Sequence, residues 1–231
     1  MEQTWRDLLF AHWPVPHEFL RPHVPSPLQL DTFDGSVWMA ITPFRMTGVR
    51  ARGLPAIPGL SEFPEINVRT YVSLEGKPGV FFFSLDAENV LAVQAARLAY
   101  HLPYFHAEMS AEPFGNGVSY RTRRREPPPA EFEAHYEPEE KTFRARPGTR
   151  EHFLVERYCL YAVDRDRVFR AEIHHAPWQL QPARAEIRRN TMGAAIGFLP
   201  TEPPLLHFSR RLEVRIWLPE QLRLSDPRPP G

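Results

Sequence analysis

Four polar side chains alternate with apolar ones along residues 65–72, and their types suit acid–base chemistry on a bound anion. Successive side chains of a strand point to opposite faces, so Glu65, Asn67, Arg69 and Tyr71 share one face. If that face lines an interior, it supplies a carboxyl group, an amide, a guanidinium and a phenol along one wall. If it faces water, it is a solvated strand surface. The alternation alone favours the solvated surface, because antiparallel strands usually direct polar residues outward.

A proline turn at residues 101–106, HLPYFH, gathers further candidate groups. The Tyr104 phenol can donate a hydrogen bond to a developing oxyanion or relay a proton. Two histidines, His101 and His106, flank this turn, and a third group, His174-His175, ends a predicted strand. No HExxH motif, H-x-H strand pair or cysteine cluster accompanies them. Because a metal site needs three or four convergent ligands, we expect no metal.

Other familiar catalytic patterns are missing from the sequence. The serines lack a G-x-S-x-G elbow and no glycine-rich phosphate loop occurs, so we set aside hydrolases of that type and nucleotide enzymes. The single cysteine, Cys159, is expected to be a small buried hydrophobe rather than a nucleophile. The basic strand at residues 121–125 lies close to the acidic residues 131–140. We therefore expect a charge-paired, solvated edge there and no nucleic-acid partner.

Length and composition favour one soluble globular unit. The chain has 231 residues, 42% of them hydrophobic, with 28 basic and 28 acidic residues. This is enough to bury a substantial core, and we expect a single domain over residues 1–231. No basic segment followed by an apolar one opens the chain, and no apolar stretch approaches the roughly 20 residues of a membrane span. A single cysteine fits a protein of the reducing cytoplasm. The absence of a long apolar stretch leads us to expect no membrane association.

Short apolar runs separated by turns predict a mainly β (β-rich α+β) fold. The expected strands are at 28–33, 37–44, 65–74, 79–85, 118–125, 132–136, 142–146, 154–163, 168–174 and 205–218. The expected helices are at 4–12, 88–101 and 184–195. We predict an antiparallel β-barrel, closed or partly open, with these few helices at its flanks.

Smaller features complete this prediction. Asp86 or Asn89 is expected to cap the helix at 88–101, and its buried stripe is expected to be Leu91, Ala95, Leu98 and Ala99. The proline-rich segment 14–27 is expected to be an ordered loop. The Gly53–Pro64 loop is read either as a lid or as a structural crossover, and the tail after Ser225 is expected to fray.

Three consecutive segments, FPEINVRTYV, GVFFFSLDAEN and LAVQAARLAYHLPYFHAEM, resemble the middle of acetoacetate decarboxylases. A longer likeness, through WRDLLFAHWPVP, LDTFDG, ERYCLY and LLHFSRRLEV, is similar to the uncharacterised YqjF-like family of the acetoacetate decarboxylase superfamily. The resemblance implies the fold of those enzymes, with Glu65 inside a cavity, which reverses the solvated interpretation of its strand. It also implies a structural role for Arg97. Tyr104-Phe105 then occupies the positions where the decarboxylases carry a pair of lysines.

Loss of that pair removes the amine that forms a Schiff base with a keto acid. The chain has only two lysines, and neither is a good substitute. Lys77 lies in a Glu-Gly-Lys-Pro-Gly turn expected at the surface. Lys141 follows three glutamates, whose charges favour its protonated form, whereas a Schiff-base lysine needs desolvation or a cationic neighbour. We therefore expect no Schiff-base chemistry.

The resulting hypothesis is a protein that binds a small anionic organic molecule in its barrel, without a cofactor. Arg69 would hold the anion, with Glu65 as base and Tyr104 or His101 as acid. The expected ligand-contacting residues are Asn67, Arg69, Tyr71 and Phe105. Whether the molecule is turned over is left open; a lyase or hydrolase reaction would rest on Glu, Tyr and His acid–base chemistry. The alternative is a noncatalytic structural or interaction protein whose barrel is filled by Tyr104 and Phe105.

Overall fold

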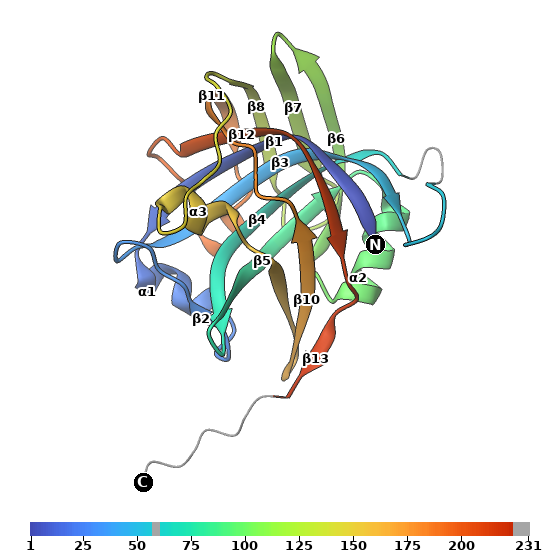
Figure 1. Cartoon of the computed structure of the whole chain (residues 1–231), viewed down its shortest axis with the longest axis vertical. Helices are drawn as coiled ribbons and strands as arrows, with labels where there is room; N and C mark the ends of the chain where they lie inside the picture. The colour runs from blue at the N-terminus through green and yellow to red at the C-terminus, as the bar shows by residue number, and fades with distance from the viewer. Residues whose placement is uncertain (57–60, 224–231) are drawn as a thin grey trace.

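The computed structural model describes residues 1–56 and 61–223, and strands make up most of it (Figure 1). In chain order the strands are β1 Glu2–Val15, β2 Gln29–Leu30, β3 Val37–Arg50, β4 Phe63–Leu74, β5 Lys77–Ala87, β6 Tyr104–Phe114, β7 Gly117–Arg124, β8 Glu131–Pro138, β9 Cys159–Asp164, β10 Arg167–His175, β11 Gln181–Asn190, β12 Leu205–Ile216 and β13 Glu220–Leu222. The helices are α1 His17–Leu20, α2 Val90–Tyr100 and α3 Arg150–Val155, with short 3₁₀ helices η1 Arg21–His23 and η2 Ala194–Ile196. Within the described ranges, every helix is too short or too polar to cross a membrane.

All the strands belong to one 13-stranded sheet whose hydrogen bonds return on themselves. The pairings β4–β5 and β10–β12 close a smaller ring of seven strands, β4-β5-β9-β10-β12-β1-β3. A larger ring runs from β5 to β12 through β6, β7, β8 and β11 instead of through β9 and β10. The two rings share β12, β1, β3, β4 and β5. The mainly β class is thus confirmed, although β5 pairs in parallel with both β6 and β9.

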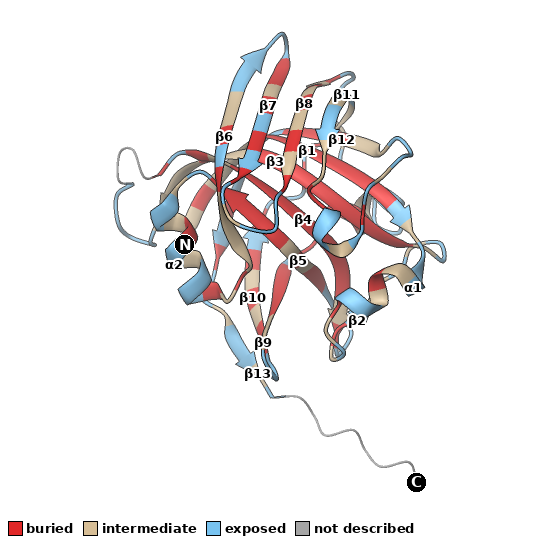
Figure 2. Ribbon diagram, turned by 180° about the vertical axis from the view of Figure 1, so that it is seen from behind, coloured by how far each residue is buried: buried red, intermediate tan, exposed pale blue. Residues whose placement is uncertain are grey.

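The strands that the two rings share are buried on both faces. On β4, Tyr71 belongs to one core cluster, together with residues of β9 and β10, whereas Ile66 and Val68 belong to another, together with residues of β7 and β8. The central strands are accordingly coloured as buried along most of their length (Figure 2). A polar face on β4 therefore has no access to bulk water. This is why the solvated interpretation, reasonable for a sheet with one wet face, does not apply to this strand.

Two of the predicted helices are strands in the structure. Residues 4–12 lie in β1, and residues 184–190 lie in β11, followed by η2. The prediction of a helix at 4–12 failed because β1 is buried on both faces from residue 7 to residue 13, so its apolar residues need not alternate. In β11 the charged residues do alternate with Ala183, Ala185 and Ile187, which is the strand period.

The predicted helix at 88–101 is confirmed as α2, and Asn89 caps it by accepting a 3.0 Å hydrogen bond from the Ala92 amide. Its predicted buried stripe is wrong. Val93 and Tyr100 are the buried residues, whereas Leu91 and Leu98 are 59% and 82% exposed. Helix α2 packs against β5 and β6 with one narrow face and leaves most of its apolar surface exposed.

Other local predictions had mixed outcomes. The strand expected at 142–146 forms a single bridge between Phe143 and Leu180, and the first part of the strand expected at 154–163 is the end of α3. The strand expected at 28–33 shrinks to β2, and a short α1 and η1 interrupt the proline-rich loop. The Gly53–Pro64 loop lies partly, and the tail after Ser225 wholly, outside the described residues.

Candidate functional site

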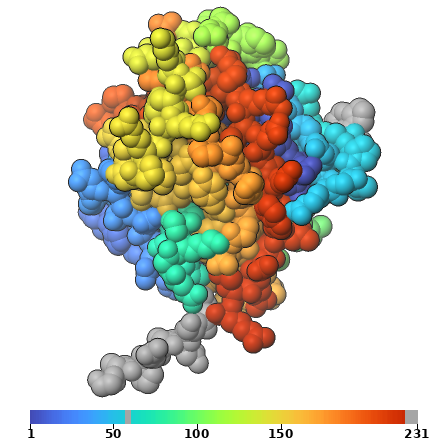
Figure 3. Space-filling model, in the orientation of Figure 1, coloured from blue at the N-terminus to red at the C-terminus, as the bar shows by residue number. Residues whose placement is uncertain are grey.

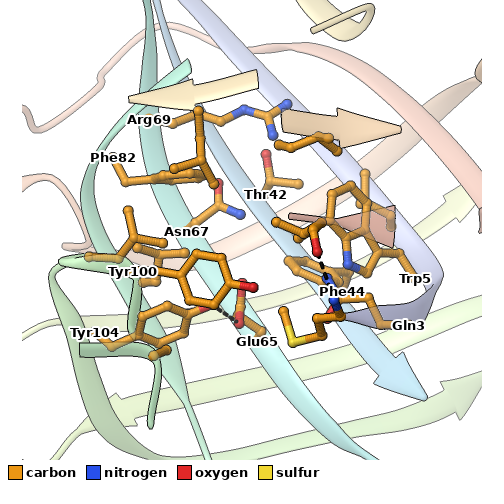
Figure 4. Close-up of a pocket in the computed structure, with 18 residues that line it drawn as sticks. Gln3, Trp5, Thr42, Phe44, Glu65, Asn67, Arg69, Phe82, Tyr100 and Tyr104 are labelled. Carbon is orange, nitrogen blue, oxygen red and sulfur yellow. Dashed lines mark hydrogen bonds between the residues drawn. The ribbon is translucent and has the colours of Figure 1, made fainter. Parts of the chain in front are cut away.

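A cavity of about 60 Å³ lies inside the smaller ring of strands, and each of the seven strands of that ring contributes to its lining. Its polar lining residues are Gln3, Trp5, Thr42, Glu65, Asn67, Arg69, Tyr100 and Tyr104. In Figure 4, Tyr100 and Tyr104 stand on one side of the cavity and Gln3 and Trp5 on the other, with Asn67 between Glu65 and Arg69. These polar side chains thus surround one small cavity.

Strand register explains how β4 brings its polar face to this cavity. Glu65 is paired across β3 with Phe44, and Asn67 with Thr42, so that these four residues line one face. Across β5, Asn67 is paired with Leu85 and Arg69 with Phe82 after a one-residue bulge, and both partners also line the cavity. The polar residues of β4 are thus flanked by Phe82 and Leu85 on one side and by Phe44 and the polar Thr42 on the other.

Glu65 and Tyr104 form the central polar pair of the site. The Tyr104 hydroxyl donates a 2.9 Å hydrogen bond to Oε2 of Glu65, which is 3% exposed. Burial raises the pKa of the Glu65 carboxyl to about 8; the Tyr104 hydrogen bond opposes this shift and the Asp86 charge adds to it. Burial, followed by the proximity of Glu65, also raises the pKa of the Tyr104 phenol well above its usual range. At neutral pH both groups therefore hold their protons.

Arg69 places a buried positive charge at the cavity. Its guanidinium carbon lies 5.4 Å from the centre of the Phe10 ring and 6.0 Å from that of Tyr71. Two other buried arginines, Arg124 and Arg157, each pair with an aspartate. Arg69 has no such carboxylate among the residues that the structure describes, and its Nε makes no hydrogen bond there. A buried guanidinium without a counter-ion is suited to bind an anion.

Five polar atoms of the lining are buried without a hydrogen-bond partner in the described part of the chain. They are Gln3 Oε1, Trp5 Nε1, Thr42 Oγ1, Asn67 Oδ1 and Arg69 Nε. Buried polar groups in folded proteins are nearly always satisfied, by protein or by ordered water. Their concentration around one cavity marks it as a place where a polar molecule would complete the hydrogen bonding.

Arg97 fixes Tyr104 at the edge of the cavity. Its Nε donates a 2.7 Å hydrogen bond to the Tyr104 carbonyl oxygen, and its Nη2 forms an ion pair with Glu126. The link joins α2 to the start of β6, which agrees with the structural role implied by the resemblance. It also holds Ala96 and Tyr100, the two α2 residues in the lining, over the site.

Four of the predicted site residues meet at this cavity, namely Glu65, Asn67, Arg69 and Tyr104. The other three lie elsewhere. The Tyr71 hydroxyl is 2.8 Å from Nε2 of His12, deeper in the same core. Phe105 packs against the Arg124 guanidinium at 3.9 Å. His101 lies outside the cavity lining, with its ring stacked on Phe169 and its Nδ1 3.8 Å from Asp164.

Sequence reasoning missed four polar residues of the lining: Gln3, Trp5, Thr42 and Tyr100. Trp5 was read as part of a helix over residues 4–12 and Gln3 lay just before that helix; in β1 the two residues share one face. Thr42 is the lone polar residue of the strand predicted at 37–44, and no sequence signal marks it. Tyr100 was assigned to α2 but not to its buried face.

Both lysines of the chain lie away from this cavity. Lys77 Nζ contacts both carboxylate oxygens of Glu172, at 2.6 and 2.7 Å, and Lys141 is exposed. The tyrosine at position 104 thus occupies the cavity edge where the resemblance placed an amine.

Comparison with known sequences and structures agrees with this architecture. The profile of the family DUF2071, described as an uncharacterized conserved protein, matches residues 2–213. The uncharacterized protein YqjF of Bacillus subtilis (strain 168) is 48% identical over 218 residues, covering 94% of this chain and 90% of that protein.

Among solved structures, the enduracididine biosynthesis enzyme MppR complexed with pyruvate superposes with a TM-score of 0.66 at 12% identity, covering 95% of this chain and 89% of that one. An acetoacetate decarboxylase-like enzyme from Sphingomonas wittichii RW1 superposes with a TM-score of 0.62 at 12% identity, covering 96% and 92% of the two chains. At this level of identity these structures establish a shared fold.

Proposed function

This chain belongs to the DUF2071 family of uncharacterized conserved proteins, and we propose that it binds a small anionic organic molecule in the cavity beside Glu65. In this proposal the smaller ring of strands acts as the wall of a barrel, and the ligand is a short monocarboxylate. The proposal invokes no cofactor, and it invokes no Schiff base because both lysines lie away from the cavity.

The observation that carries the proposal is Arg69, a buried guanidinium that lines the cavity without a carboxylate partner among the described residues. An isolated buried charge is costly, and an anionic ligand would compensate it. Glu65 would not compete for this role, since its raised pKa keeps the carboxyl neutral near pH 7. The cavity therefore favours a single negative charge on its ligand.

The size of the cavity restricts the ligand further. A water molecule needs about 10–15 Å³ of such volume, so the 60 Å³ available here accommodates roughly four to six non-hydrogen atoms. Short carboxylates have this size. The structural neighbour MppR has been solved with pyruvate, which is a molecule of this class.

The protonation states also favour a changed role for Glu65 if a reaction takes place. A carboxyl that is protonated at neutral pH donates a hydrogen bond or a proton to a bound molecule, so Glu65 would act as an acid rather than as the base expected from sequence. Tyr104 would hold its orientation through their hydrogen bond. His101 has no part in this proposal, because it lies outside the lining.

The alternative is a noncatalytic structural or interaction protein with a filled interior. It is supported by the small volume, since cavities that bind drug-sized ligands usually measure about 300–1,000 Å³. In that case water would satisfy the unpaired polar atoms, and no carboxylate would bind.

Ligand-dependent thermal stabilisation separates these two functions. The protein would be heated with acetate, propionate, pyruvate or lactate, and in parallel with the neutral amides acetamide and propionamide. We expect at least one carboxylate, and neither amide, to raise the Tm of the wild type.

Arg69→Met should abolish that rise, and Arg69→Lys should retain part of it. The exposed Arg125→Met is the matched control and should respond like the wild type. Equal responses to carboxylates and amides, or a rise that survives in Arg69→Met, would contradict the proposal.

A further inference from the structure

Beside Phe82, the wall around the cavity has a section that backbone hydrogen bonds do not close in the described part of the chain. Strands β5 and β9 pair only at Val80–Leu160 and Phe81–Tyr161, and β5 does not pair with β6 until Leu85. In the described part of the chain, residues 82–84 of β5 therefore have no strand partner on that side. By contrast, β1 and β12 pair over ten residues, and β13 continues the pairing of β12 along β10.

A surface groove lies directly outside this section. It measures about 500 Å³ and is lined by β5, by β9 and by the turn between α2 and β6. Phe82 and Leu102 line both this outer groove and the inner cavity. These two buried side chains thus form a partition between the cavity and the solvent-facing groove. On the face shown in Figure 3, in contrast, orange and red side chains from the C-terminal third of the chain cover the middle of the molecule.

We propose that small molecules reach the inner cavity through this gap between β5 and β9, and that Phe82 and Leu102 form the portal that selects them. These two side chains can open the section by changing rotamers, without any loss of strand pairing. The portal thus admits molecules with a cross-section no larger than the space that these side chains vacate. The inference concerns access to the cavity, and it stands whether or not a carboxylate is the ligand.

His101 has a defined part in this arrangement. It is the residue after α2 and has a left-handed backbone, with φ of 53°, so the chain turns sharply just before Leu102. Its ring stacks on Phe169 with the centroids 4.3 Å apart, and its Nδ1 lies 3.8 Å from Asp164. These contacts tie the turn that carries Leu102 to the β9–β10 hairpin, and His101 is therefore a positioning residue for the portal.

Cysteine accessibility tests the portal without a ligand. Thr42 lines the cavity and is fully buried, so Thr42→Cys places a thiol of similar size inside it. The rate of its modification by methyl methanethiosulfonate is followed by mass spectrometry. The native Cys159, which is buried and outside the lining, reports in the same sample on general opening of the fold.

In the Thr42→Cys protein, Leu102→Ala should accelerate modification of residue 42 about tenfold or more, because truncating a packed leucine weakens the closed arrangement. Leu102→Trp should slow it. His101→Gly tolerates the left-handed backbone but loses the ring contacts. It should therefore accelerate the modification of residue 42 although Phe82 and Leu102 are unchanged. Ile216→Ala is the matched control, since it truncates the cavity wall beside Met1, away from the groove, and should leave the rate nearly unchanged.

The portal would be refuted if Ile216→Ala accelerated labelling as much as Leu102→Ala, because access would then lie at the Met1 side. Equal acceleration at Cys159 would refute it too, since labelling would then follow general opening of the fold. The failure of every carboxylate to bind would leave this result unaffected, so the portal and the proposed ligand fail separately.

Discussion

The Tyr104 hydroxyl and the Glu65 carboxyl, 39 residues apart in the sequence, are joined by a 2.9 Å hydrogen bond inside the core. The bond exists because β4 carries Glu65 on the face toward the smaller ring, while the parallel pairing of Leu85 with Tyr104 starts β6 beside it. Burial makes both groups harder to ionise; the proximity of Glu65 adds to this effect for Tyr104, whereas the hydrogen bond from Tyr104 partly offsets it for Glu65. The pair therefore keeps two protons at a cavity that also receives the positive charge of Arg69.

Replacing Tyr104 by phenylalanine should raise the pKa of Glu65 further, because the hydrogen bond from the phenol is the interaction that lowers it. The change should also destabilise the fold by about 1 kcal/mol, the usual contribution of one buried hydrogen bond. Infrared titration of the Glu65 carboxyl band, assigned with Glu65→Gln, would measure the shift. Tyr100→Phe is the control, since it removes a second phenol of the lining that has no assigned bond to Glu65. A lower Glu65 pKa in Tyr104→Phe would contradict this account.

Glu65 should make the protein less stable as the pH rises from about 4.5 to 8. The folded state keeps a proton that the unfolded state loses in this window, so ionisation favours unfolding. The full effect above pH 8 amounts to at most about 5 kcal/mol, from 1.36 kcal/mol for each pKa unit. Urea unfolding at several pH values should show Glu65→Gln gaining stability over the wild type as the pH increases. The exposed Glu112→Gln should show no such trend, and parallel curves for Glu65→Gln and the wild type would disprove the assignment.

The interior position of the β4 residues could be predicted only in part from the sequence. Alternation correctly grouped Glu65, Asn67 and Arg69 on one face, because that depends on local strand geometry. Alternation alone wrongly placed this face in solvent. Whether a strand face is exposed or buried depends on whether a second layer of strands covers it. The resemblance to acetoacetate decarboxylases supplied the missing information for Glu65. No local rule could have done so.

Residues were misplaced where burial on both faces, or tertiary contacts, decided the outcome. The apolar run of β1 suited a helix as well as a strand, and this concealed the role of Trp5. Tyr71 was correctly placed on the same strand face as Arg69. The Tyr71 hydroxyl is hydrogen-bonded to His12 on β1, however, and does not line the cavity. Phe105 was grouped with Tyr104 by sequence adjacency, yet neighbours on a strand point in opposite directions, and Phe105 instead covers Arg124.

The buried ion pair beside the site should be essential to the fold. Arg124 makes two 2.7 Å hydrogen bonds to the Asp86 carboxylate, and both side chains are almost fully buried. Removing one partner leaves an uncompensated buried charge, so Asp86→Ala should cost about 3–5 kcal/mol in urea unfolding. Arg125 and Glu108 form an exposed pair, and Glu108→Ala should cost no more than about 1 kcal/mol. A loss in Asp86→Ala as small as that of the exposed control would show that the pair is dispensable.

Histidine 12 should limit stability on the acid side. Burial first, and then the nearby charge of Arg69, lower its pKa well below the usual value of 6.5. Below pH 6.5 the unfolded state therefore binds a proton that the folded state does not bind. The free energy of unfolding consequently falls as the pH decreases.

In unfolding experiments between pH 4.5 and 7, His12→Gln should lose less stability on acidification than the wild type, because glutamine can still bond to Tyr71 but does not titrate. The exposed His17→Gln should behave like the wild type. If His12→Gln kept the full acid dependence, another group would have to be responsible. Together with Glu65, which weakens the fold as the pH rises, His12 should confine maximal stability to an intermediate pH.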